Sequence, residues 1–311
     1  MKNSYKPEGS NSRSGLLSFQ RHYPKTPLAL TGDGRIYEGQ VIKCDSDLNL
    51  WVDFLGCRCI IPKGEVTYLF PGEPLKDIAI ISRVGKTVCF KIIGATKSES
   101  GDDIPVLSRR LAQIECMEEY ISTLSPGDII DAKITHMEQF GAFCDIGCGI
   151  ISLLSVDCIS ISRISHPKDR FDIGQSIRAI VKNRTEEGRI YITHRELLGT
   201  WEENAARFTQ GQTVAGIIRS VESYGVFVEL APNLAGLAEP KDDIAPSQAA
   251  AVYIKSIIPE RMKIKLVLID AKAEPPQKKP IEYIGDTHLS DHIDYWQYSP
   301  DCSKKIIESI F

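Results

Sequence analysis

Two stretches of the sequence decide the fold: residues 126–146 read PGDIIDAKITHMEQFGAFCDI, and residues 210–230 read QGQTVAGIIRSVESYGVFVEL. Both have glycine second and a phenylalanine sixteen positions later, and in both an aromatic–glycine pair begins three residues before that phenylalanine. Their short β-branched runs, separated by turn-forming residues, are typical of strands. Such self-similarity indicates an internal repeat.

A fainter third copy precedes them at residues 34–54, which read GRIYEGQVIKCDSDLNLWVDF. Here Trp51 takes the place of the phenylalanine, one residue later than in the other copies. Fourth and fifth strands are expected at 85–91 and 106–108 in the first copy, at 174–181 and 189–193 in the middle copy, and at 252–255 and 263–266 in the last. The last copy has no opening glycine, so we expect its fourth and fifth strands to pair differently.

Five short strands in about 70 residues predict a small Greek-key barrel of the OB type. The expected fold class is all-β with short connecting helices: three tandem five-stranded OB-fold barrels, the third atypical. Helices are expected over residues 111–121 after Ser108 and 196–208 after Thr193, because Ser and Thr are good N-caps, with Trp201 as a packing anchor. The expected domains are a flexible N-terminal arm (1–30), a divergent first barrel with a linker helix (31–122), a second barrel with a linker helix (123–207), a third barrel (208–271), and a Pro-rich linker with an aromatic C-terminal tail, part of which docks or forms a short helix (272–311).

The composition excludes several functions. With 37 basic and 41 acidic residues the net charge is −4, which argues against binding nucleic acid by bulk electrostatics but not against base stacking on aromatic rings. Residues 1–30 lack the apolar run of a signal peptide, and no stretch approaches the ~20 apolar residues that span a bilayer. We therefore expect a cytoplasmic protein without a membrane partner.

The nine cysteines are odd in number and include no C-x-x-C motif. We expect reduced, mostly buried thiols. Cys57 with Cys59, or Cys144 with Cys148, could contribute to a metal site, but no second pair has zinc-ligand spacing. The sequence therefore predicts neither a metal nor a cofactor.

Strand alternation places a large ring on the polar face of every copy. Phe143 shares a face with Asp145, and Phe227 and Trp51 likewise lie on the side of an acid. The rings are either covered by a neighbouring barrel or loop, or form a platform on which unpaired bases stack, worth ~1–3 kcal/mol per base.

Further candidates lie near these rings. Phe140 and Tyr224 precede a glycine at the adjacent turn and could offer a second ring. Basic residues on nearby strands could contact phosphates, although each is also an ordinary surface charge: Lys133, Lys182, Arg184, Arg189, Arg219, Lys255, Arg261, Lys263 and Lys265. His166 could stack on a base or simply hydrogen-bond within its loop.

The FGAFCDIG and YGVFVEL blocks resemble the RNA-binding repeat of ribosomal protein S-one, most of all the S-one-type proteins of Clostridia and relatives. The resemblance is specific over residues 124–198, good over 208–238 and weak over 34–110. It implies an OB-fold face that binds single-stranded RNA, with ring positions at Phe140 and Phe143 and at Tyr224 and Phe227, and a basic position at Arg189 and Lys263. The family's histidine after the third strand is replaced by Ser152 and Glu239, and the first copy keeps only Trp51.

The sequence thus predicts a non-enzymatic protein that binds single-stranded RNA, with messenger RNA and the small ribosomal subunit as partners and no small-molecule substrate. One alternative is a nuclease, but the acids are scattered, and the two Asp pairs, 102–103 and 242–243, fall in expected loops. The other is an interaction scaffold whose rings are buried against partner proteins. Salt dependence separates these cases, because phosphate contacts weaken with ionic strength.

Overall fold

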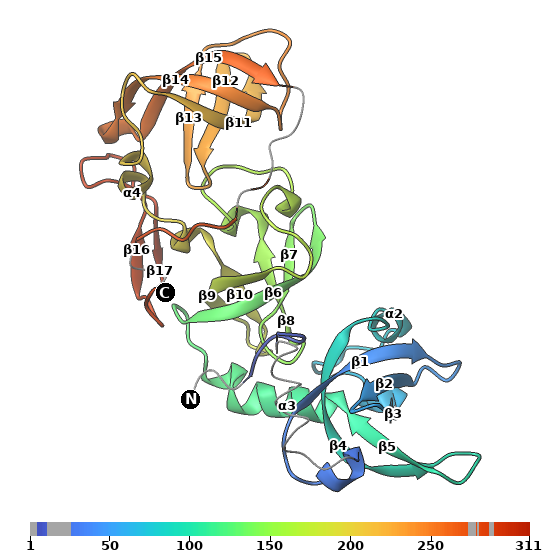
Figure 1. The fold of residues 1–311 in the computed structure, drawn as a ribbon. Helices are drawn as coiled ribbons and strands as arrows, with labels where there is room; N and C mark the ends of the chain where they lie inside the picture. The colour runs from blue at the N-terminus through green and yellow to red at the C-terminus, as the bar shows by residue number, and fades with distance from the viewer. Residues whose placement is uncertain (1–4, 11–25, 273–277, 279, 286–288) are drawn as a thin grey trace. The chain divides into compact units, whose positions relative to one another are not determined.

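The strands of the protein close into three barrels, seen in a computed structural model that describes residues 5–10, 26–272, 278, 280–285 and 289–311 (Figure 1). Barrel 1 consists of β1 (Tyr37–Cys44), β2 (Leu50–Phe54), β3 (Cys57–Ile61), β4 (Thr87–Lys97) and β5 (Asp103–Ser108). Barrel 2 consists of β6 (Ile129–Glu138), β7 (Gly141–Asp145), β8 (Ile151–Ser155), β9 (Ser176–Arg184) and β10 (Ile190–Thr193). Barrel 3 consists of β11 (Thr213–Glu222), β12 (Gly225–Ala231), β13 (Leu234–Ala238), β14 (Ala249–Ile258) and β15 (Lys263–Lys272).

All three barrels share one strand order. The first three strands neighbour each other in sequence order, the fifth pairs in parallel with the third, and the fourth closes the barrel between the fifth and the first. Closure removes the exposed sheet edges that would otherwise invite aggregation. The predicted fold class of three five-stranded barrels is confirmed.

Barrel 3 keeps this order although it lacks the expected glycine. Gly85 and Gly174 precede the fourth strand of their barrels with φ of 78° and 86°, and Ser247 takes the same left-handed conformation with φ of 72°. In each case the N–H donates a hydrogen bond of 2.7 or 2.8 Å to a carbonyl of the first strand. The expected change of pairing is therefore limited to an additional bulge: β14 and β15 have two, whereas the corresponding strands of barrels 1 and 2 have one.

The chain divides into two compact units. The first is Met1–Leu124 with Asp145–Ile151 and Glu186–Gly188; the second is Ser125–Cys144, Ser152–Thr185 and Arg189–Phe311. The first unit contains barrel 1, α2 (Asp77–Ile81) and α3 (Arg109–Glu119). As predicted, α3 follows Ser108, whose hydroxyl caps it by accepting the Leu111 N–H at 2.9 Å.

The N-terminal arm, expected to be flexible, is packed over residues 5–10. The ring of Tyr5 stacks on Tyr120 with a centroid distance of 6.0 Å. Glu8 is buried and accepts hydrogen bonds from Arg109 at 2.7 and 3.0 Å, while its own N–H donates to Asp145 at 2.7 Å. A buried carboxylate needs such partners, so this expectation is wrong for these residues.

In the second unit, the helix expected from Glu196 onward is interrupted. A short 3-10 helix (Arg195–Leu197) ends before Gly199, which has φ of 81°, and α4 (Trp201–Ala205) then begins at a Thr200 capping box. Left-handed residues end helices. Trp201 is 2% exposed and packs in the barrel 3 core, which confirms its role as a packing anchor.

The C-terminal tail docks onto the second unit, as expected. Its strands β16 (Tyr295–Gln297) and β17 (Glu308–Ile310) pair with each other, and Trp296 and Tyr298 are buried in the barrel 3 core cluster. The Tyr283 hydroxyl accepts the backbone N–H of Arg178 on β9 at 2.7 Å. Residues 273–277 and 279 of the expected Pro-rich linker, and the tail residues 286–288, lie outside the described residues.

Candidate nucleic-acid interface

Barrel 2 presents two rings on its outer face. On β7 the side chains of Ala142 and Cys144 are fully buried, so Phe143 between them points outward and is half-buried. Phe140, in the preceding turn, is 56% exposed. The two rings meet edge to face with a centroid distance of 5.9 Å and an interplanar angle of 90°, an arrangement that aromatic quadrupoles favour.

A third ring, missed from the sequence, joins this pair. His136 on β6 stacks on Phe143 with a centroid distance of 6.0 Å and an angle of 26°, and its Nε2 lies 2.6 Å from a Glu138 carboxylate oxygen. Ile134 and Met137 are both buried, so simple alternation fails here. The Thr135 hydroxyl donates to the Phe143 carbonyl at 3.0 Å. This irregularity turns His136 outward beside Phe143.

Tyr191 on β10 lies on the same side and was also missed. Its neighbours Ile190 and Ile192 are buried, so its side chain is directed outward and is half-buried. It pairs in parallel with Leu153 on β8, and β8 is the neighbour of β7. At about 4.8 Å per strand, Tyr191 is about 10 Å from the Phe143 strand. The sequence signal was present, because Tyr191 alternates with two isoleucines.

Barrel 3 repeats the ring pair. Tyr224 is 66% exposed, and it meets Phe227 edge to face at 6.1 Å and 87°. Across the sheet, Phe227 on β12 pairs with Ser220 on β11 and with Leu237 on β13. Leu237 in turn pairs with Lys265 on β15. We call these outward-facing sets ring rows: His136, Phe143, Leu153 and Tyr191 in barrel 2, and Ser220, Phe227, Leu237 and Lys265 in barrel 3.

The parallel pairs make the two rows equivalent: Leu153 with Tyr191 matches Leu237 with Lys265. Two residues before these lie Arg189 and Lys263, which agrees with the correspondence expected from the sequence. The same register makes Ser155, rather than Ser152, the counterpart of Glu239. Ser152 is buried and donates to the Ile190 carbonyl at 2.7 Å. The assignment of Ser152 to that position is therefore wrong.

The other predicted basic residues fall into two groups. Lys255, Arg261 and Lys263 are exposed on the β14–β15 hairpin, together with Lys265. In barrel 2, Lys133, Arg184 and Arg189 are half-buried, and Lys182 is exposed with its Nζ 3.2 Å from the Sγ of Cys158. The Nδ1 of His166 accepts the Lys168 N–H at 3.0 Å and caps a 3-10 turn, which is the local hydrogen-bonding alternative.

The acids two residues after Phe143 and Phe227 are buried. Asp145 is 2% exposed and accepts backbone N–H groups of Glu8, Gly147 and Gly149. Glu229 is 4% exposed and accepts from Arg219 at 2.7 Å and Arg170 at 2.5 Å. Arg219 is therefore committed to an ion pair and is not a free phosphate ligand.

Barrel 1 holds its ring differently. Trp51 is half-buried, Lys43 Nζ lies 5.0 Å from its ring centroid, and its Nε1 donates to Asp45 at 3.1 Å. Its row continues through Ile60 to Val106. Cation–π contact and a hydrogen bond thus satisfy Trp51 within the barrel.

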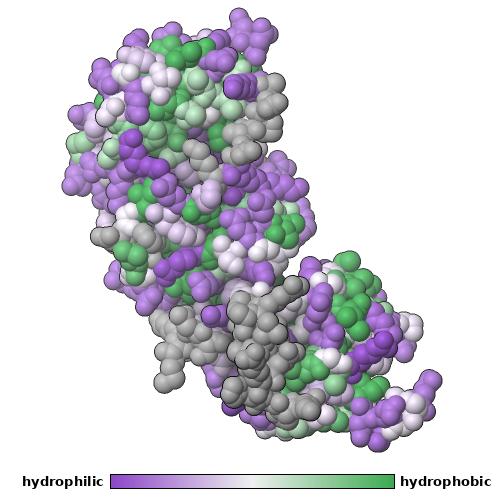
Figure 2. Space-filling model, viewed as in Figure 1, coloured by the Kyte–Doolittle hydropathy of each residue, from purple (hydrophilic) through white to green (hydrophobic). Residues whose placement is uncertain are grey.

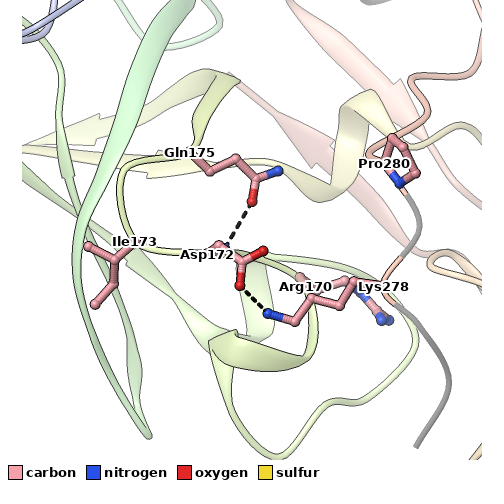
Figure 3. Close-up of a pocket in the computed structure, with 6 residues that line it drawn as sticks. All are labelled: Arg170, Asp172, Ile173, Gln175, Lys278 and Pro280. Carbon is pink, nitrogen blue, oxygen red and sulfur yellow. Dashed lines mark hydrogen bonds and ion pairs between the residues drawn. The ribbon is translucent and has the colours of Figure 1, made fainter.

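The second unit also contains a hollow of about 430 Å³ (Figure 3). It is lined by Arg170, Asp172, Ile173, Gln175, Lys278 and Pro280. Figure 3 shows Lys278 directed at the Asp172 carboxylate and Gln175 at the Asp172 backbone, at 2.5 and 2.9 Å. Arg170 forms an ion pair with Glu229. The charges of this hollow are therefore paired locally, and we do not assign it to RNA.

The described residues contain neither a metal-ligand cluster nor a membrane-spanning helix. No group of three or more His, Cys, Asp or Glu side chains there could hold a metal ion. The nine cysteines, all of them described, are free thiols, six of them buried. None of the helices in the described part of the chain is long and apolar enough to cross a membrane.

Comparison with known proteins agrees with this geometry. Residues 123–195 match the S1 RNA binding domain, a range that contains all of barrel 2. The chain is 25% identical over 244 residues to small ribosomal subunit protein bS1 of Rhizobium meliloti, covering 73% of this chain and 41% of that protein. It is 27% identical over 202 residues to bS1 of Staphylococcus saprophyticus, covering 60% and 50%, and 26% identical over 245 residues to that of Staphylococcus aureus strain COL, covering 73% and 59%.

The chain thus spans about 41–59% of the length of these curated relatives. A solved multidomain protein with nucleic acid binding domains from Streptococcus pneumoniae aligns with 79% of this chain and 75% of its own, at 16% identity and a TM-score of 0.26. Together, the S1 domain and the distant likeness to bS1 support an S1-like RNA-binding protein. The expected likeness to clostridial proteins stays a prediction.

Proposed function

We propose that this protein binds single-stranded RNA on the ring rows of barrels 2 and 3, and that it helps messenger RNA engage the small ribosomal subunit. The observation that carries the proposal is the repeated edge-to-face pair, Phe140 with Phe143 and Tyr224 with Phe227. In both pairs the turn residue is more than half exposed. Exposing a large ring to water costs free energy, so its repetition at one position of two barrels favours a ligand.

The chemistry of the pairs suits unpaired bases. Every base has a π-face, and stacking on an aromatic side chain contributes ~1–3 kcal/mol per base with little dependence on sequence. A duplex keeps its bases stacked on each other, so these rings should discriminate against it. Barrels 2 and 3 belong to one chain, so once RNA is bound to one barrel, the effective concentration of that RNA at the other barrel is raised.

The first experiment measures fluorescence anisotropy of labelled oligo(U) and of a labelled RNA duplex at two salt concentrations. We expect salt-sensitive binding to oligo(U), weak binding to the duplex, and loss of at least tenfold in affinity for the Phe143→Ala/Phe227→Ala variant. Trp51→Ala is the matched control and should bind as wild type does. Equal binding of oligo(U) by the double variant would overturn the proposal.

The role in translation rests on the bS1 likeness and is tested separately. Co-sedimentation with purified small ribosomal subunits, with and without oligo(U), should show that the protein associates with the subunit, either directly or through the RNA. If RNA binds but the subunit does not, the translation role fails and the RNA-binding role remains.

The alternative of a protein-interaction scaffold is favoured by one observation in barrel 1. Exposed apolar side chains gather over α2 (Figure 2); among them Ile78 is 67% and Ile81 48% exposed. Such patches often mark protein contacts. Unchanged RNA binding after ring removal, together with salt-insensitive binding to ribosomal proteins, would favour this function.

A further inference from the structure

The ring rows of barrels 2 and 3 are equivalent in position but differ in chemistry at two places. Where barrel 2 has His136 beside the central phenylalanine, barrel 3 has Ser220, and where barrel 2 has Tyr191, barrel 3 has Lys265. The leucine between, Leu153 or Leu237, is common to both. The difference therefore replaces two flat rings with a small hydroxyl and a cation.

From this we infer, building on the proposed function, that the two barrels bind the same single strand in different ways: barrel 2 holds bases through an extended stack, whereas barrel 3 combines its ring pair with contacts to the phosphate backbone. In barrel 2, Phe140, Phe143, His136 and Tyr191 present four rings along one face. Tyr191 lies two strands beyond Phe143, about 10 Å away, and Leu153 gives the surface between them an apolar floor. Consecutive bases can lie over such a surface.

In barrel 3 the same direction leads to cations. Lys265 is exposed two strands from Phe227, and Lys263 is exposed two residues before it on β15. Lys255 and Arg261, also exposed, lie on β14 and in the turn of the same hairpin. Lysines beside a stacking ring can contact phosphates. The RNA strand therefore continues from Tyr224 and Phe227 over these exposed basic side chains.

The two modes respond differently to salt. For single strands each phosphate contact contributes about 0.7 to the slope of log affinity against log salt, whereas stacking does not release counterions. Lys263→Gln/Lys265→Gln should therefore flatten the slope by about 1.4. Tyr191→Ala should weaken binding about tenfold at every salt concentration and leave the slope unchanged.

The decisive experiment titrates oligo(U) and an abasic oligonucleotide of equal length into wild type, Tyr191→Ala, Lys263→Gln/Lys265→Gln and the exchange variant Tyr191→Lys/Lys265→Tyr, each over a range of salt. The abasic strand keeps the phosphates but offers no base. Removing the lysines should weaken both strands, while removing Tyr191 should weaken oligo(U) alone. Tyr191→Phe and Lys265→Arg are the conservative controls and should bind as wild type does.

The outcomes distinguish this inference from the proposed function. If Phe143→Ala/Phe227→Ala abolishes binding but the Tyr191 and Lys265 variants change affinity and slope alike, the division between barrels is wrong and the RNA-binding function stands. If ring removal has no effect either, the proposed function itself fails. An exchange variant with wild-type affinity for both strands would also overturn the division.

Discussion

Barrels 1 and 2 have the same strand order and carry a half-buried ring at the same strand position, yet the neighbours of that ring differ. In barrel 1, Lys43 covers Trp51 and Asp45 binds its indole N–H. In barrel 2, His136 stacks on Phe143, and Phe140 stands exposed beside it. The comparison teaches that strand alternation determines where a ring lies, whereas its cross-strand neighbours determine whether a ligand can use it.

The exits from the two barrels make a second contrast. Arg109 and His194 are the second residues of matching SRR and THR tripeptides, and both are buried, at 2% and 1% exposure. Arg109 stays charged because Glu8 pairs with it. His194 instead packs against Phe171 and Tyr283, with Nδ1 at 3.1 Å from the Ile159 carbonyl. Burial lowers the pKa of His194 to about 4, so it is neutral in the folded protein.

The largest effect is expected from breaking the charged exit of barrel 1. Arg109→Ala leaves Glu8 buried without its main partner, which should cost ~3–5 kcal/mol in the unfolding free energy of the first unit. Urea unfolding followed by tryptophan fluorescence measures it. The transition of the first unit is the one that Trp51 reports, because Trp201 and Trp296 belong to the second unit. Arg110→Ala, at a side chain 39% exposed, is the control. Similar losses in the two variants would show that the buried pair is not special.

The next effect is a difference in acid stability between the units. The folded pKa of His194 is below its ordinary value of 6.5, so the unfolded chain binds more protons; the second unit should keep this stability above pH 6.5 and lose about 3 kcal/mol as pH falls through 4. Burial opposes the charge of Glu8, but Arg109 outweighs it and lowers the pKa of Glu8 below 4.5. The first unit should therefore begin to weaken only below about pH 4.5.

His194→Phe tests this contrast, because a phenyl ring keeps the contacts with Phe171 and Tyr283 but cannot titrate. Urea unfolding of the variant between pH 7 and 4, followed by far-UV circular dichroism, should show a flatter dependence for the second unit. A dependence as steep as that of wild type would mean that another group governs acid unfolding.

A smaller effect is expected from giving barrel 1 the row of barrel 2. Lys43→His/Val106→Tyr replaces the cation at Trp51 with a ring like His136 and places a tyrosine at the counterpart of Tyr191. Oligo(U) should then quench Trp51 fluorescence and gain ~1 kcal/mol of affinity from the added stacking. Quenching of Trp51 to the same extent in wild type would show that barrel 1 already binds bases.

The smallest effect concerns Ser247, the left-handed serine before β14. A non-glycine residue pays ~1–2 kcal/mol there, and glycine loses ~0.5–1 kcal/mol through its freer unfolded chain, so Ser247→Gly should stabilise the second unit by about 0.5–1 kcal/mol. The reverse change, Gly174→Ser, should destabilise it. Thermal unfolding of both variants checks the pair; a destabilising Ser247→Gly would contradict this reading of the turn.

The sequence was enough to predict the repeat, the barrels and the ring pairs, because each depends on local alternation and spacing. The match between Arg189 and Lys263 came from the family resemblance. It did not reveal His136, because a strand irregularity between two buried residues, Ile134 and Met137, breaks the alternation. The commitment of Arg219 to Glu229 depends on a partner ten residues away on the next strand. Burial of Glu8 depends on Arg109, about a hundred residues later, and spacing cannot show such contacts.

The central claim is that bases lie on the rings of barrels 2 and 3 and not on that of barrel 1. The most direct test is photo-crosslinking of the intact protein to an oligonucleotide containing 4-thiouridine, followed by mass spectrometry of the linked peptides. We predict crosslinks at Phe140 or Phe143 and at Tyr224 or Phe227, with none at Trp51. Crosslinks concentrated at Trp51, or spread evenly over residues outside the ring rows, would contradict the account.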